Sequence, residues 1–239
     1  MTNPVTYSSP VTYISQDGIA TITMDDGKVN ALSNDMLDAL NAAFDKAEAV
    51  GEVVIFTGRT GMFCAGFDLT IMMQGPEKVL ALMTKGGAFS RRILTFPTPV
   101  ICAVSGHAMA MAALVLLSSD YCIGIEGKVK TGMNEVAIGM TMPQAAVEIA
   151  TARLAPPYYR RAINNAETFN PQTAMTAGFL HTIVAPENLM ASAQDKAEQM
   201  RKLDMTAFAA TKMKSVQPLL DNLKHANVLD KQSDIFKGT

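Results

Sequence analysis

The stretch "GHAMAMAALVLLSSD", residues 106–120, decides the fold because its composition allows only two environments. After its glycine and histidine it contains no charged or polar side chain until Ser118. A helix that is apolar on all sides is either buried inside a protein or lies in a membrane. Together with the preceding "TPVICAVS" (98–105), the run approaches the roughly 20 residues that a membrane span requires.

The residues in the middle of this run argue against a membrane span. A serine, a glycine and a histidine (105–107) would lie at the centre of the bilayer, where polar groups and a helix breaker are costly. The upstream half is rich in β-branched residues and follows two prolines, which favours a strand. We therefore predict a short buried strand at 99–104, a tight glycine turn, and a buried helix from about 108 to 119.

The surrounding sequence alternates between strand-like and helix-like patterns, which indicates an α/β fold. "VTYISQDGIATITM" (11–24) predicts a β-hairpin around Asp17-Gly18, and Ser33 is placed to cap the helix that follows. The remaining predictions are helices over 34–49 and 77–94, strands over 52–58 and 121–125, and a loop of small residues in "RTGMFCAGFDL" (59–69).

The end of the chain has a different pattern from its beginning. From Pro186 onward the signal is helical only, with segments near 186–203 and 206–227. No linker rich in glycine, proline or serine separates this part from the rest. We therefore divide the chain into a core over 1–185 and a C-terminal helical region over 186–239 that packs on the core.

Composition limits the classes of function. The chain has 239 residues, of which 49% are hydrophobic, enough for one large core. Only 18% are charged, which favours surface hidden in subunit contacts. The net charge is −2 and no basic run is present, so we expect neither a nucleic-acid partner nor a membrane-surface partner.

Cysteine usage and the amino terminus indicate a cytoplasmic protein. The three cysteines, two of them inside apolar stretches, favour a reducing compartment over a disulfide framework. Their spacings and those of the three histidines match no metal signature, so we expect no metal. No basic residue precedes Lys28, which argues against a transit peptide and against a signal peptide.

Two stretches are suited to placing backbone groups, rather than side chains, at a site. In "FCAGFDL" (63–69), Gly66 stands between Ala65 and a helical turn expected at Phe67. In "GHAMAMAA", the buried helix is expected to begin within a residue or two of Gly106. The start of a helix has unpaired N–H groups with partial positive charge, and two of them together form an oxyanion hole. Either stretch alone is also compatible with an ordinary tight turn.

A third stretch carries a carboxylate. In "GMNEVAIGMTMP" (132–143), Glu135 is the acidic residue within a run of apolar residues, glycine and asparagine. Burial among such neighbours would raise its pKa, which suits proton transfer near neutral pH. The alternative is a loop glutamate that is exposed or paired with a cation. Signatures of dinucleotide binding, phosphate loops, serine hydrolases and zinc proteases are absent from the sequence.

The order and spacing of these stretches resembles the crotonase (enoyl-CoA hydratase/isomerase) superfamily. The resemblance covers roughly residues 11–190. The matching segments are "VNALS" (29–33), "FCAGFDL" (63–69), "PVICAVSGHAMAMAALVLLSSDY" (99–121), "GMNEVAIG" (132–139) and "TAMTAGFLHTIV" (173–184).

The resemblance implies a spiral core of ββα turns, with C-terminal helices that pack trimers or pairs of trimers. It implies an acyl-CoA thioester substrate whose carbonyl oxygen lies between the backbone N–H groups of Phe67 and Met111. Coenzyme A belongs to the substrate, so no separate cofactor is expected. The substrate-binding residues implied are Asn30, Ala31, Leu32, Ala65, Gly66, Asp68, Gly106 and Leu114.

The chain departs from the family pattern at two site positions. The glycine-rich turn is replaced by Ala110-Met111-Ala112, where a positive φ would be unfavourable for methionine. Hydratases of the family usually carry two glutamates; the second position matches Glu135, but the first falls at Leu114. In this respect the chain is similar to the Δ3,Δ2-enoyl-CoA isomerases. Glu148 is a possible second acid, although we expect it to serve structure.

One carboxylate favours one reaction over another. Hydration needs groups both to activate water and to protonate C2, whereas moving a double bond from C3 to C2 needs one base that takes a proton and returns it. We therefore predict an enoyl-CoA isomerase of fatty-acid metabolism with Glu135 as acid/base. The alternatives are an enoyl-CoA hydratase and a non-catalytic scaffold that binds CoA esters. "SDIFKGT" (233–239) resembles the beginning of a family segment, and we assign no phosphate-binding lysine there.

Overall fold

The computed structural model of the protein describes residues 9–232. It opens with the predicted hairpin, in which β1 (Val11–Gln16) pairs antiparallel with β2 (Ile19–Met24). Asp17 and Gly18 both have positive φ, at 52° and 76°, as the turn of a two-residue hairpin requires. Helix α1 (Asn34–Val50) begins as predicted at Ser33, whose hydroxyl accepts the N–H of Met36 at 3.1 Å.

The core repeats one unit, in which each turn of the chain gives one strand to each of two sheets. The larger sheet has the order β1-β2-β3-β5-β7-β9 and is parallel from β2 onward. The smaller sheet is parallel, in the order β4-β6-β8. Its strands alternate in the chain with those of the larger sheet: β3 (Val53–Gly58), β4 (Gly61–Cys64), β5 (Val100–Val104), β6 (Gly106–Met109), β7 (Tyr121–Ile125) and β8 (Thr131–Gly132).

Helices follow the second strand of each turn, which completes the predicted spiral of ββα units. They are α2 (Leu69–Met72) and α3 (Pro76–Thr95) after β4, α4 (Met111–Ser118) after β6, and α5 (Gln144–Arg153) after β8 and a 3₁₀ turn, η1 (Val136–Ile138). Next come α6 (Pro156–Ile163), α7 (Pro171–Ala177) and β9 (Thr182–Val184).

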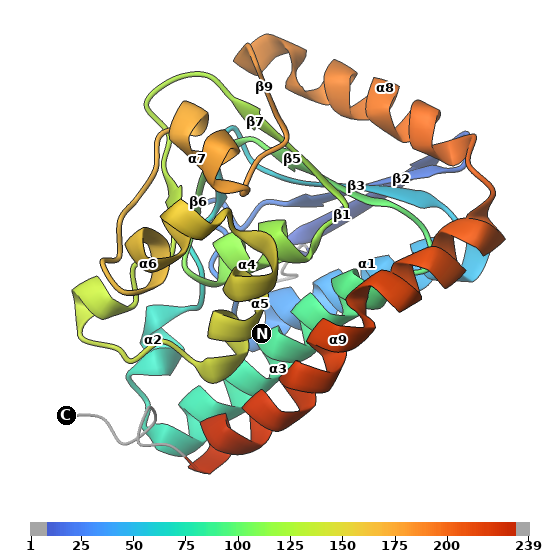
Figure 1. The fold of residues 1–239 in the computed structure, drawn as a ribbon. Coiled ribbons are helices and arrows are strands. Elements are labelled where there is room, and N and C mark those ends of the chain that lie inside the picture. The colour runs from blue at the N-terminus through green and yellow to red at the C-terminus, as the bar shows by residue number, and fades with distance from the viewer. Residues whose placement is uncertain (1–8, 233–239) are drawn as a thin grey trace, which may run out of the picture.

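The larger sheet is buried on both faces. Along β3, Val53 and Ile55 face one apolar layer, whereas Val54 and Phe56 face the other. Helix α8 (Leu189–Arg201), which follows the 3₁₀ turn η2 (Pro186–Asn188), covers the first face, and α1, α3 and α4 lie on the opposite side (Figure 1). Burial on both faces explains why β3 is a continuous apolar run without alternation.

Helix α4 is the buried helix predicted from the sequence, since all eight of its residues are buried. Among residues 9–232, no helix is long and apolar enough to cross a bilayer. The predicted start of this helix was wrong, because Gly106 belongs to β6 and the helix begins only at Met111. The loop predicted over 59–69 likewise contains β4, the partner of β6.

The physical reason for both errors lies in the contact between these two short strands. A Cβ atom at Gly106 would lie only 2.0 Å from the carbonyl carbon of Gly61, so the backbones meet where both residues are glycines. A strand of four residues is too short to show a hydrophobic period, and tertiary pairing alone makes it a strand.

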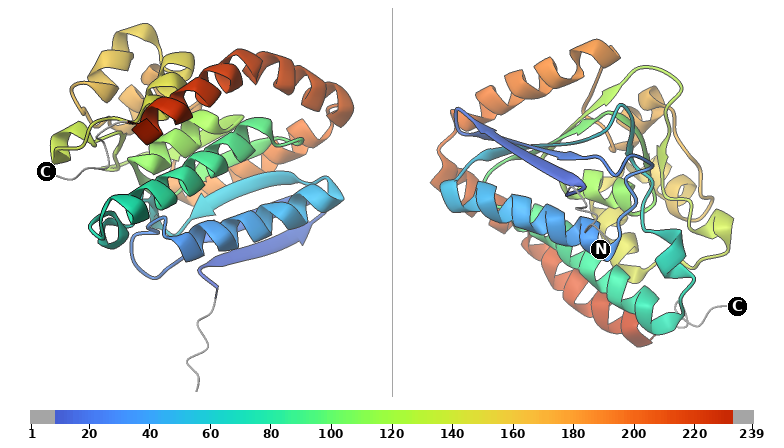
Figure 2. Two further views of the ribbon diagram at one scale, coloured as in Figure 1. Left: turned by 90° about the horizontal axis from the view of Figure 1, so that it is seen from below. Right: turned by 180° about the vertical axis from the view of Figure 1, so that it is seen from behind.

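The C-terminal helices pack directly onto the core. Helix α9 (Met205–Gln232) runs alongside α3 and packs against α5, as the two views in Figure 2 show. The prediction of a purely helical end after Pro186 is confirmed over the described residues. The segment 233–239 lies outside them, and so does most of the amino-terminal stretch before β1.

Candidate active site

The backbone N–H of Phe67 is directed away from the strand-like segment that holds it. Leu32 donates its N–H to the carbonyl of Gly66 at 2.8 Å, and Asp68 donates its N–H to the carbonyl of Leu32 at 3.2 Å. Peptide groups alternate in direction along an extended chain, so the N–H of Phe67, between these two, points to the other side. Within the described residues it donates to no acceptor.

The N–H of Met111 also has no acceptor in the part of the chain that the structure describes, for a different reason. Met111 is the first residue of α4, and the first N–H groups of a helix have no partner inside it. The turn before it is held by Ala110, which donates its N–H to Gly132 at 2.8 Å and accepts the N–H of Ala113 at 2.9 Å. The unfavourable positive φ expected for Met111 falls instead on Ala110, at 53°.

These two turns touch each other at Gly66. A Cβ atom there would lie 2.7 Å from Cβ of Ala110 and 3.4 Å from N of Met111, and Gly66 has φ of 96°. Only glycine tolerates both the conformation and the contact. The stretches that carry Phe67 and Met111 therefore meet, although 44 residues of chain separate the two (67 to 111). Two adjacent backbone donors without acceptors are the elements of an oxyanion hole.

Glu135 is buried and forms no ion pair within residues 9–232, which contradicts the exposed or cation-paired glutamate considered from the sequence. Its side chain is 9% exposed, and within the described residues its Oε2 atom has no hydrogen-bond partner. Burial raises the pKa of Glu135 above its ordinary value, and no charged neighbour contributes to the shift. The segment that carries it is tied to the Met111 turn through Gly132, which accepts the N–H of Ala110.

A mostly apolar cavity of about 220 Å³ opens beside the two donors. Phe67, Met111 and Leu114 line one end of it, and side chains from α3, α5 and α9 line the rest. Leu114 is buried at 7% exposure, so an apolar side chain occupies the place where the family resemblance allows a second carboxylate. The Phe67 ring lies against Gly86 of α3, where a Cβ atom would come within 2.4 Å of it.

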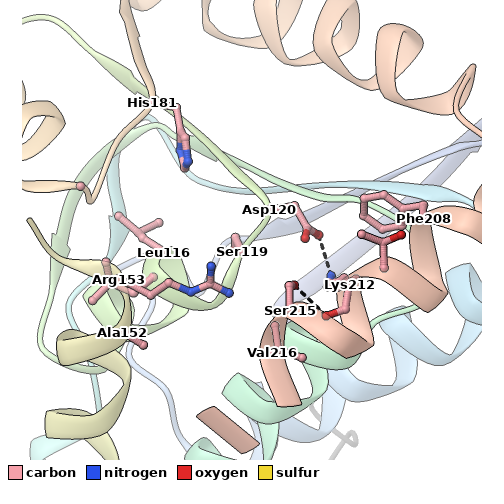
Figure 3. A pocket seen from close by; sticks show the side chains of 13 residues that line it. Leu116, Ser119, Asp120, Ala152, Arg153, His181, Phe208, Lys212, Ser215 and Val216 are labelled. Atoms are coloured by element: carbon pink, nitrogen blue, oxygen red, sulfur yellow. Dashed lines mark hydrogen bonds and ion pairs between the residues drawn. The ribbon is translucent and has the colours of Figure 1, made fainter. Parts of the chain in front are cut away.

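A larger cavity of about 430 Å³ lies at the other end of α4, and Figure 3 shows its lining. None of the site residues predicted from the sequence lines it. Its buried Lys212 forms an ion pair with Asp120 at 2.7 Å, and Asp120 also accepts the N–H of Val100 at 2.8 Å. Because its buried charges are paired with each other, we place the active site at the smaller cavity.

The other predicted substrate-binding residues fall into two groups. The loop around residues 30–32 pairs with the Gly66–Asp68 segment and so borders the candidate hole. Ala65 is fixed next to it by donating its N–H to Val29 at 3.0 Å. Gly106 lies in β6 against Gly61 and does not open the helix.

Two of these side chains are occupied by internal contacts. The amide of Asn30 donates to the carbonyls of Met24 and Phe63, and Asn30 is fully buried with φ of 53°. Asp68 accepts the N–H and hydroxyl of Thr70 and so caps α2. Both residues therefore shape the backbone of the site.

Sequence reasoning missed Asp26 and Gly86. The carboxylate of Asp26 accepts the N–H groups of Lys28, Asn30 and Ala31, which folds the loop. "DDG" is a signal for such a turn and could have revealed it. Gly86 could have been noticed as half of a Gly-Gly pair inside a helix, where glycine is costly unless something packs there.

The arrangement can stabilise a negative charge on oxygen while a buried carboxylate moves a proton nearby. Within residues 9–232, no group of three or more histidine, cysteine, aspartate or glutamate side chains could hold a metal ion.

Comparison with known proteins places these elements in a family. The model of the enoyl-CoA hydratase/isomerase family matches residues 15–239. A solved enoyl-CoA hydratase/isomerase family protein from Pseudomonas syringae is 44% identical, with a TM-score of 0.92 over 93% of this chain and 97% of that one. A Mycobacterium tuberculosis protein, described as an enoyl-CoA isomerase in one solved structure and as a probable enoyl-CoA hydratase in another, is 38% identical in the first, with a TM-score of 0.91 over 95% of this chain and 100% of that one.

A third relative carries the other of the two activity names. The putative enoyl-CoA hydratase of Thermus thermophilus is 27% identical over 77% of this chain and 74% of its own length. The names of the relatives thus include both reactions, whereas the family match spans nearly the whole chain. The chain belongs to the enoyl-CoA hydratase/isomerase family.

Proposed function

We propose that the protein isomerises Δ3-enoyl-CoA thioesters to Δ2-enoyl-CoA thioesters. The observation that carries the proposal is the buried carboxylate of Glu135, whose Oε2 atom has no partner within residues 9–232, combined with the buried Leu114. One carboxylate suffices for this reaction, and the apolar wall at Leu114 offers no group to activate water.

The proposed reaction moves one proton. Glu135 takes a proton from C2, and the electron pair of that C–H bond delocalises onto the thioester oxygen. The N–H groups of Phe67 and Met111 hold that oxygen as the enolate forms. The protonated carboxyl then returns the proton to C4, and the double bond lies between C2 and C3. The raised pKa of Glu135 suits both steps, because a carboxylate that binds a proton more strongly takes it from C2 more readily and then holds it for return to C4.

Hydration is the alternative and requires a second acid. Glu148 is the candidate, but its carboxylate accepts hydrogen bonds from Gln144 at 2.8 Å and from Asn222 at 3.0 Å. These contacts fix it between α5 and α9. A non-catalytic scaffold is disfavoured because the altered turn keeps its geometry through Ala110.

The proposal extends to the setting of the enzyme. We propose a cytoplasmic homotrimer or hexamer that needs no cofactor apart from the coenzyme A of its substrate. Several large apolar side chains are exposed on the single chain, among them Leu69, Met73 and Ile138, which is consistent with subunit contacts. Sedimentation of a stable monomer at micromolar concentration would contradict the trimer.

The test of the reaction is to incubate the pure protein with 3-enoyl-CoA and 2-enoyl-CoA separately. Isomerisation predicts that 3-enoyl-CoA is converted to 2-enoyl-CoA and that 2-enoyl-CoA gives little 3-hydroxyacyl-CoA. Rapid formation of 3-hydroxyacyl-CoA would favour hydration. Leu114→Glu is the companion variant, since a second carboxylate should add hydratase activity if its absence is what decides the reaction.

A further inference from the structure

The helix that follows the Glu135 segment lacks a cap of its own. Helix α5 begins at Gln144 after Pro143, and Pro143 provides no side-chain acceptor for the first N–H groups. Unpaired N–H groups at a helix start need an acceptor and favour a negative charge.

Asp230, one turn from the end of α9, supplies that acceptor. Its Oδ1 atom accepts the N–H of Gln144 at 2.6 Å, and its Oδ2 atom accepts the N–H of Ala145 at 3.0 Å. Asp230 is 9% exposed, so these bonds are largely shielded from water. A carboxylate 85 residues further along the chain thus caps α5, with one oxygen for each N–H.

This contact attaches the far end of the segment that carries Glu135 to α9. At its start, Gly132 accepts the N–H of Ala110 from the oxyanion turn. Between the attachments, the segment has mainly local bonds: the carbonyl of Glu135 accepts the N–H groups of Ile138 and Met140. Met133 is fully buried before Glu135, whereas Val136 and Ile138 after it are exposed, so packing holds the start of the segment more than its middle. The cap on α5 therefore fixes the far end of the segment.

We propose that Asp230 is a positioning residue for Glu135, which it holds beside the oxyanion hole by capping α5. The inference rests on the proposed role of Glu135. The inference gives the end of α9 a role in the reaction. Asn227 and Asp230, both near that end, also line the apolar cavity. Arg91 of α3 is the other charged side chain along that cavity, and Glu148 of α5 is turned toward Asn222.

The test compares Asp230→Ala with Asp230→Asn and with Asn222→Ala. The control, Asn222→Ala, removes another α9–α5 contact, the exposed bond to Glu148, without touching the cap. We expect kcat to fall about 10- to 100-fold in Asp230→Ala, because a displacement of about 1 Å has effects of this size. Asp230→Asn keeps one acceptor oxygen and should fall less, and Asn222→Ala should equal the wild type.

A pH profile separates positioning from general destabilisation. Water that reaches Glu135 in Asp230→Ala lowers its pKa toward the ordinary value, so the acidic limb of the rate profile should move to lower pH. Pro143→Ser in the Asp230→Ala background gives α5 a cap of its own and should recover part of kcat. A folded Asp230→Ala protein with wild-type kcat and an unmoved limb would overturn the proposal.

Hydrogen exchange measures the same effect without turnover. The amides of Ile138, Met140, Gln144 and Ala145 should exchange faster in Asp230→Ala than in Asn222→Ala. Equal exchange in the two variants contradicts the role of Asp230, whatever the activity of the wild type. A wild-type protein that is inert on every enoyl-CoA would instead contradict the proposed function. Should Asp230→Ala fail to fold, Asp230→Asn is judged by the same measurements.

Discussion

The two ends of helix α4 differ in what they do with buried charge. At its N-terminal end, two backbone N–H groups and the Oε2 atom of Glu135 are left without partners among the described residues. At its C-terminal end, the buried Lys212 is paired with Asp120, which also accepts a backbone N–H. A buried polar group without a partner costs stability, so its presence at one end only indicates a site kept ready for a ligand.

The largest effect on turnover should come from replacing Glu135. Glu135→Gln keeps the size of the side chain and removes the base, so turnover should fall about 10²- to 10⁴-fold while binding of CoA esters persists. Steady-state kinetics and binding measured on the same preparation check this. The matched control is Glu148→Gln, whose carboxylate is already engaged by Gln144 and Asn222 and whose loss should leave the rate unchanged. Equal rates for both variants would mean that Glu135 is not the base.

The next effect concerns the backbone donors. Gly66→Ala adds a Cβ atom 2.7 Å from that of Ala110, which forces the Phe67 and Met111 turns apart. Loss of one oxyanion donor costs about 10²- to 10³-fold in kcat, and we expect a decrease of this size. Gly75→Ala serves as control, since Gly75 also has positive φ, at 100°, but no atom within 4 Å of a Cβ. A comparable loss in both variants would point to backbone strain rather than to the hole.

Breaking the ion pair at the C-terminal end of α4 should lower the free energy of unfolding and leave turnover unchanged. Lys212→Met leaves Asp120 buried without its cation and should lower the free energy of unfolding by about 3 kcal/mol, measured by denaturant titration. Turnover per folded molecule should not change. Lys224→Met removes an exposed pair with Asp221, in which both side chains are more than half exposed, and should have little effect. A large loss of kcat in Lys212→Met would contradict the separation of the two ends.

The smallest effect is a pH-dependent gain in stability at the N-terminal end. Because burial raises the pKa of Glu135 in the folded state, ionisation is penalised there, and the stability present below the unfolded value of 4.5 is lost as pH rises through the folded value. Glu135→Gln does not lose this stability, because its side chain does not ionise. Its Tm should therefore exceed that of the wild type at neutral pH, and the difference should disappear below pH 4.5. A Tm difference that is independent of pH would show that the carboxylate is not desolvated.

Much of the fold could be predicted because its signals are local. The hairpin at Asp17-Gly18, the cap at Ser33 and the apolar run of α4 each depend on a few neighbouring residues. The strands β4 and β6 could not be predicted, since four residues are too few to show a hydrophobic period and become strands only by pairing with each other.

The candidate site shows the same division. Its residue types were evident in the sequence: a glutamate among apolar neighbours and a leucine in place of a second carboxylate. That Glu135 is buried and unpaired, and that Ala110 rather than Met111 takes the positive φ, required coordinates. Both depend on which distant segments pack against the turn.

The sequence by itself determined the α/β class, the buried helix and the family resemblance, because composition, periodicity and motif order are properties of the chain. Only the tertiary structure decided that Gly66 meets Ala110, that Asp230 caps α5, and that the charges at the two ends of α4 are paired at one end only. The physical reason is that hydrogen bonds and desolvation depend on contacts between residues far apart in the chain, and no local pattern records which of them meet.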